Sequence, residues 1–185
     1  LQRRRNFLLG TAGALALGIT ARAGAGPFAV ADALATTDLD VSTITHPGLL
    51  VTEADLQRIR DKLAANAEPW VGGWNMMLKT NNTDLNAMPR PLALVIRGGQ
   101  GENYWQMTGD MVRALHLALR WKITNDENYA KKAVEFLNAW SSTLTGLGGD
   151  SNVYLASGLY GNQWANAAEL MRTYSGWAKQ DIARF

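Results

Sequence analysis

Apolar residues recur at intervals of three and four along most of this chain, which is the period of an amphipathic helix. The pattern predicts one helix starting at Thr52, a second starting at Pro69, and three longer ones over 105–123, 128–144 and 153–174. Another helix is expected to start shortly before the end of the sequence. Strand-type alternation is nowhere sustained. We therefore predict an all-α fold, in which short breaks between long helices imply antiparallel helical hairpins.

Local signals support the first two helix starts. Thr52 is a good N-cap and Asp55 follows at the third helical position, which is a short-armed capping box. Val51 and Leu56 occupy the positions of a hydrophobic staple. Pro69 suits the first position of a helix because its missing N–H would have no partner there.

Two stretches interrupt the helices. Residues 79–103 hold prolines, a Gly-Gly pair and many Asn, so we predict a long loop with a short extended piece at 92–96. Loops of this length in compact domains are often functional. The glycine-rich run 146–150 ends the fourth helix.

The fifth helix is predicted to have two contrasting faces. At 100° per residue, Trp164, Ala167, Ala168, Met171 and Tyr174 share one apolar sector. The other side gathers Asn162, Gln163, Asn166, Glu169 and Thr173. A solvated surface is one interpretation of this polar face. Solvated faces are usually charged, however, and oriented amides suit sugar hydroxyls or a carboxylate, so a sugar-binding face is the other.

The first residues differ from the rest. Arg3, Arg4 and Arg5 precede an apolar, Gly/Ala-rich run that ends in the small-residue pattern Ala21-Arg22-Ala23. This order is typical of a secretory signal, and the arginine pair resembles a twin-arginine export signal. We predict a signal peptide over 1–23, cut after Ala23 or somewhat later, and a periplasmic or secreted protein. An uncut membrane anchor is the alternative, although the apolar run is shorter than the roughly 20 residues that span a bilayer.

Removal of this segment changes the charge. It holds four of the 18 basic side chains and no acid, so the remainder has 14 basic and 16 acidic side chains and a net charge of −2. The sequence pI of about 9.0 thus comes largely from the export signal. Bulk charge gives no support for a nucleic-acid partner. We also expect no stable membrane insertion after cleavage.

Composition also limits the chemistry. The chain has no Cys, which excludes disulfides, and His46 and His116 are too few for a His-only metal site. We therefore expect no metal and no cofactor. Residues 24–45 are small and polar and are predicted to be a linker, so the folded domain is expected over 46–185.

Several sequence blocks resemble, in order, the N-terminal half of the alginate-lyase domain. The blocks are residues 46–50 (HPGLL), 68–70 (EPW), 118–124 (ALRWKIT), 137–144 (LNAWSSTL) and above all 158–169 (GLYGNQWANAAE). The chain looks most like polysaccharide lyase family thirty-eight, and more distantly like family five. The match runs from His46 to the last residue. The segment 103–106 departs from it, with aromatics where the family has an acidic and small-residue opening to a helix.

This resemblance implies an incomplete (α/α) toroid whose cleft binds an acidic polysaccharide such as alginate or glucuronan. It also implies cleavage by β-elimination. In that reaction a neutral or basic side chain must offset the uronate carboxylate before the C5 proton can leave, and a Tyr or His removes the proton. The catalytic residues are expected mostly downstream of Phe185. The family pattern maps onto Gln163 and Asn166 as substrate-binding residues, with Tyr160 and Asn162 as further candidates.

Other residues have a structural interpretation beside a functional one. Tyr104 or Trp105 could stack on a sugar ring, but core packing is the stronger expectation for both. His116 is expected to be a hydrogen-bonded structural histidine rather than a base. His46 is expected to order the chain ahead of the first helix. Arg172 could pair with a uronate, with Glu169 or with solvent.

Two other functions remain open at this point. One is a non-catalytic carbohydrate-binding protein built from the same helical hairpins. The other is a glycoside hydrolase on a similar toroid, whose products would lack the unsaturated bond that a lyase leaves.

Overall fold

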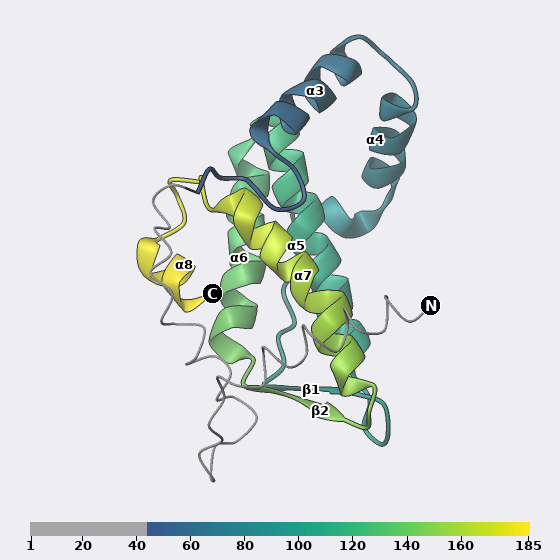
Figure 1. Ribbon diagram of the computed structural model, residues 1–185, viewed down its shortest axis with the longest axis vertical. Helices are drawn as coiled ribbons and strands as arrows, with labels where there is room; N and C mark the ends of the chain where they lie inside the picture. The colour runs from purple at the N-terminus through teal and green to yellow at the C-terminus, as the bar shows by residue number, and fades with distance from the viewer. Residues whose placement is uncertain (1–43) are drawn as a thin grey trace, which may run out of the picture. The chain divides into compact units, whose positions relative to one another are not determined.

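The computed structural model describes residues 44–185. The predicted signal peptide and all but the last two residues of the predicted linker lie outside the described residues. Figure 1 shows the described part as a coloured ribbon.

Most of this part is helical, as the sequence predicted. The helices are α3 (Glu53–Ala64), α4 (Trp70–Lys79), α5 (Tyr104–Thr124), α6 (Glu127–Thr143), α7 (Val153–Met171) and α8 (Lys179–Arg184). A 3₁₀ turn, η2 (Asn81–Thr83), follows α4, and two short strands, β1 (Leu94–Arg97) and β2 (Gly146–Gly149), precede α5 and α7. The fifth helix was predicted to continue to residue 174, which is three residues too far, because α7 ends at Met171.

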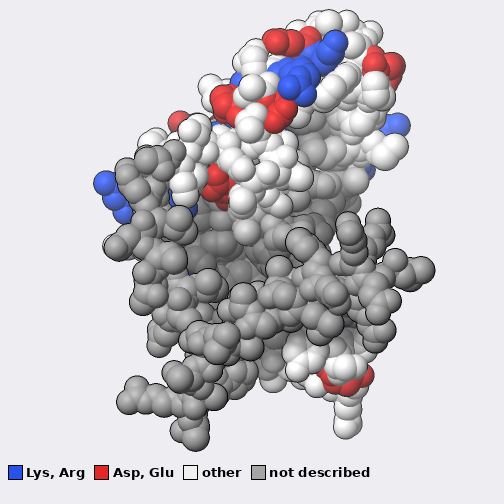
Figure 2. Space-filling model, viewed as in Figure 1, with Lys and Arg blue, Asp and Glu red and all other residues white. Residues whose placement is uncertain are grey.

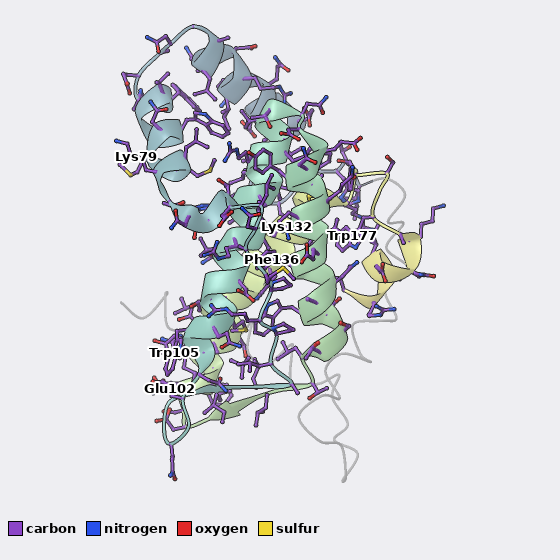
Figure 3. All side chains as sticks on the ribbon, turned by 180° about the vertical axis from the view of Figure 1, so that it is seen from behind. Lys79, Glu102, Trp105, Lys132, Phe136 and Trp177 are labelled. Atoms are coloured by element: carbon purple, nitrogen blue, oxygen red, sulfur yellow. The ribbon has the colours of Figure 1, made fainter. Side chains whose placement is uncertain are left out.

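The core lies where α5 packs against α6 and α7. The apolar stripe of each helix faces the other two, and Phe136 lies fully buried between them (Figure 3). The buried members of this cluster include Leu56, Ala114, Leu117, Ala118, Ala133, Leu137, Ala167, Leu170 and Met171. Helices α3 and α4 lie at the upper end of the molecule in Figure 1, where no residue of α4 is fully buried.

The capping box that was predicted at the start of α3 is present. The Asp55 backbone N–H donates to Thr52 Oγ1 at 3.3 Å, and the Thr52 N–H donates back to Asp55 Oδ2 at 3.0 Å. The Thr52 side chain also donates to that carboxylate, and these bonds hold the pKa of Asp55 below its ordinary value. The start of α3 therefore follows directly from the local sequence.

The two strands form a parallel pair that the sequence analysis missed in part. The extended piece was expected over 92–96 and lies at Leu94–Arg97, but its partner β2 is the run that was predicted only as a break. Leu94 pairs with Gly146 and Arg97 with Gly149. Because three of the four residues in β2 are glycine, the strand shows no side-chain alternation that could reveal it. The pair joins the chain just before α5 to the chain just before α7.

Side chains of α5 form hydrogen bonds with the 3₁₀ turn that follows α4. Arg113 donates to the carbonyl of Asn81, and Arg120 donates to Thr83 Oγ1 at 2.7 Å. His116 Nδ1 lies 3.3 Å from the Asn82 amide nitrogen. His116 is half-buried, and burial lowers its pKa below the ordinary value of 6.5, so the neutral ring is favoured. This environment fits the structural role that was expected for His116.

Candidate functional site

The amide side chains of α7 do not share one environment. Asn162 is exposed, while Gln163 is half-buried and its Nε2 donates only a long 3.5 Å bond to the Leu159 carbonyl of its own helix. Asn166 Oδ1 accepts the backbone N–H of Leu50 at 3.1 Å. One of the predicted sugar contacts is thus partly used within the protein.

The segment that uses it, residues 46–50, lies across the upper half of α7. Glu169 Oε1 accepts the Gly48 N–H at 2.9 Å and lies 2.6 Å from His46 Nδ1. His46 therefore orders the chain ahead of α3, as expected, and does so through Glu169. We call His46–Leu50 the strap.

Two hollows border α7, and the strap lines one of them. One hollow of about 470 Å³ is lined by Gly161, Trp164 and Ala165 of α7 together with Trp140 of α6. Another, of about 330 Å³, is lined by Ala165, Ala168 and Glu169 of α7, by Arg172 directly after it and by Leu49 of the strap. At 100° per residue most of these positions lie far round the helix from Gln163 and Asn166.

Tyr160 belongs to a cluster at the lower end of the molecule. The rings of Tyr160 and Tyr104 are nearly parallel, at 12°, with centroids 6.0 Å apart. Arg97, the last residue of β1, places its Cζ atom 4.8 Å from the Tyr104 ring centroid and 5.1 Å from that of Tyr160. Its Nη1 donates to the Tyr160 hydroxyl oxygen at 2.8 Å. We call Arg97, Tyr104, Trp105 and Tyr160 the aromatic–arginine cluster.

The nearby carboxylates are occupied elsewhere. Glu102 accepts the Gly98 N–H at 2.7 Å, and Asp150 accepts both the backbone and the side-chain N–H groups of Asn152 at 2.8 Å. Within residues 44–185, Arg97 forms no ion pair. A guanidinium has five N–H donors, and the one side-chain hydrogen bond that Arg97 makes within residues 44–185 is the one to Tyr160.

Gly98 allows this arrangement. Its φ angle is +79°, and a Cβ at this position would collide with the Asp150 carboxylate. Only glycine fits such a conformation and such a close approach. The turn after β1 therefore brings the loop before α5 directly against the loop before α7.

Trp105 contradicts the stronger expectation that it packs in the core. Its side chain is 58% exposed, and Figure 3 shows it on the outside of the lower end of α5, close to Glu102. The reason is rotational: Tyr104 faces α7, and the next residue is turned by about 100° away from it. The ring meets Tyr104 edge-on, with centroids 5.8 Å apart.

Sequence reasoning missed two members of this region, Arg97 and Asp110. Asp110 is fully buried, and its Oδ2 accepts the Trp140 indole N–H at 2.9 Å and the Arg90 backbone N–H at 2.6 Å. A lone Asp between Met107 and Met111 of the apolar stripe was the available signal. It is a structural tie between α5, α6 and the loop that leads to β1.

Two further properties bear on the site. Within residues 44–185, no three His, Asp or Glu side chains gather closely enough to hold a metal ion. None of the helices in that range combines the length and apolar character needed to cross a bilayer.

Compared with protein-family models, with curated proteins and with solved structures, the chain matches none of them.

Proposed function

We propose that this chain is the N-terminal, substrate-binding part of an exported polysaccharide lyase that acts on an acidic polyuronate such as alginate or glucuronan. The observation that carries the proposal is the aromatic–arginine cluster. It combines an arginine that has no acidic partner among residues 44–185 with an exposed aromatic ring at one end of the molecule.

The chemistry of the cluster fits a uronate. The guanidinium of Arg97 lies over the rings of Tyr104 and Tyr160. A guanidinium can give two parallel N–H bonds to a carboxylate. The exposed face of Trp105 suits the apolar C–H face of a sugar ring. A charge-assisted bond of this kind would also offset the carboxylate charge, which β-elimination requires.

The resemblance to the alginate-lyase domain is the second support. It extends the fold to an (α/α) toroid of antiparallel hairpins, of which α5, α6 and α7 would form one part. The packing of α5 against both other helices is compatible with two helical layers. In this proposal the groups that move the proton lie mostly beyond Phe185.

A non-catalytic sugar-binding protein is the second candidate. The observation in its favour is that neither histidine is near the cluster as a base: His46 contacts Glu169, and His116 contacts Asn82. Binding without cleavage would distinguish this candidate.

Incubation of the full-length protein with alginate, glucuronan and a neutral glucan tests the proposal. Absorbance of the unsaturated product should rise with one of the two polyuronates and stay flat with the neutral glucan. Saturable polyuronate binding without that absorbance would favour the second candidate. Absence of both binding and product would exclude the two functions together.

A further inference from the structure

The last turn of α5 carries a lysine in an unusual position. Lys122 Nζ donates to the hydroxyl of Thr173 at 2.7 Å and lies 4.7 Å from the ring centroid of Trp121. Its hydrogen-bond partner is therefore neutral, and an aromatic ring covers one side of the amine. Among residues 44–185, Lys122 has no ion pair.

A hollow of about 280 Å³ opens beside it. Its lining includes Lys122, Trp121 and Ile123 of α5, with Glu53 and Arg60 of α3 opposite. Figure 2 shows acidic and basic side chains mixed over the upper end of the molecule, where α3 lies. The hollow is large enough for a small organic molecule to reach the amine.

Glu53 and Arg60, the two charged side chains of α3 that line the hollow, form an ion pair with each other. Arg60 Nη2 lies 2.6 Å from Glu53 Oε1, and Arg60 Nη1 donates to the backbone carbonyl of Lys122 at 2.9 Å. Glu53 therefore forms its ion pair with Arg60 and not with Lys122.

Burial shifts the protonation of Lys122 toward the neutral amine. Burial lowers the pKa of Lys122 below its ordinary value of 10.5; Glu53 opposes this and Arg60 adds to it. A larger share of the amine is thus unprotonated near neutral pH than in an exposed lysine. Only the unprotonated form is nucleophilic.

Other lysines of the chain are held differently. Lys132 Nζ lies 2.6 Å from Glu135, and its side chain is only 14% exposed. Lys131 lies 3.7 Å from Glu127. Lys79 is exposed. Lys132 is therefore a matched control that is poorly exposed but ion-paired, and Lys79 is an exposed control.

We propose that Lys122 is a reactive amine that forms imines with small aldehydes, the open-chain form of a reducing sugar among them. The nitrogen lone pair attacks the carbonyl carbon, and the C=O π electrons move to oxygen. A proton then passes from nitrogen to that oxygen to give a carbinolamine. Loss of one water then leaves a C=N bond, so the net change is amine plus aldehyde to imine plus water. No oxidant or reductant takes part.

Reductive trapping tests the proposal. The chain is incubated with glycolaldehyde and cyanoborohydride near neutral pH, and peptide mass spectrometry follows the modification of each lysine over time. Lys122 should react on the order of threefold or more faster than Lys79, and faster still than Lys132. A rate for Lys122 equal to or below that of Lys79 would overturn the proposal.

Two variants make the result specific. Lys122→Arg should remove the fast-reacting site and leave the rates of Lys79 and Lys132 unchanged, with circular dichroism confirming the helical fold. Glu53→Gln removes the charge that raises the pKa of Lys122, so it should speed the modification of Lys122 alone. A slower reaction at Lys122 in a folded Glu53→Gln variant would contradict the electrostatic cause and, with it, the proposal.

Discussion

The two ends of α7 carry polar side chains of similar appearance and use them differently. At the upper end, Asn166 and Glu169 accept hydrogen bonds from the strap. At the lower end, Tyr160 holds an arginine whose remaining donors have no acidic partner among the described residues. A polar helix face thus becomes a candidate binding surface only where the protein has not already satisfied it.

The largest effect is expected at the upper end. Glu169→Ala removes the acceptor of the Gly48 N–H and the contact of His46, so the free energy of unfolding should fall by about 2–3 kcal/mol. Urea unfolding measures this loss. Polyuronate affinity, measured under conditions where the variant is folded, should not change; a parallel loss of affinity would place the strap within the binding surface.

Arg97→Gln should give the next largest effect, on binding. Loss of a charge-assisted bond to a carboxylate should weaken polyuronate binding by about 2 kcal/mol, roughly 30-fold in Kd. Titration calorimetry measures it, and Arg172→Gln, which removes an exposed arginine directly after the end of α7, is the matched control. Equal losses of affinity in the two variants would show that the effect comes from nonspecific electrostatic attraction rather than from a site at Arg97.

Trp105→Ala should have a smaller effect on binding. Removal of the ring should cost about 1 kcal/mol, or roughly fivefold in Kd, with little change in the unfolding midpoint because the ring is mostly exposed. Tryptophan fluorescence on titration with polyuronate gives an independent measurement. A large drop in thermal stability would instead restore a packing role for Trp105.

The smallest effects separate two of the predicted sugar contacts. Asn166→Ala should lower the free energy of unfolding by about 0.5–1 kcal/mol, because the Leu50 N–H loses its acceptor. Gln163→Ala should change it by less than about 0.5 kcal/mol. If Gln163→Ala weakens polyuronate binding while Asn166→Ala does not, the sugar path passes Gln163 and avoids the part of α7 that the strap covers.

Much of the fold was predictable because its signals are local. The capping box at Thr52, the apolar stripe of α5 and the breaks between helices depend on neighbouring residues, and they placed most elements within a few positions. Strand β2 was not predictable, since a glycine-rich strand has no pattern of its own and depends on a partner far away in the sequence.

Of the candidate site, the sequence named Tyr160 as a substrate-binding candidate, and Tyr104 and Trp105 only as an alternative to core packing. Arg97 joins it through the β1–β2 pair, and Trp105 was expected in the core because aromatic residues usually pack there. The strap could not be foreseen either, because the contact between Glu169 and Gly48 spans most of the folded chain. Contacts of this kind depend on tertiary structure rather than on local sequence.

The parallel pair of β1 and β2 also determines when the cluster can assemble. Leu94 and Gly146 are 52 positions apart, and the whole of α5 and α6 lies between them. Closing so long a segment has an entropic cost that must be met before the distant contacts contribute, so it belongs to the slow steps of folding. Arg97 and Tyr160 should therefore meet late, and a ligand that needs both would bind only to molecules that have completed this closure.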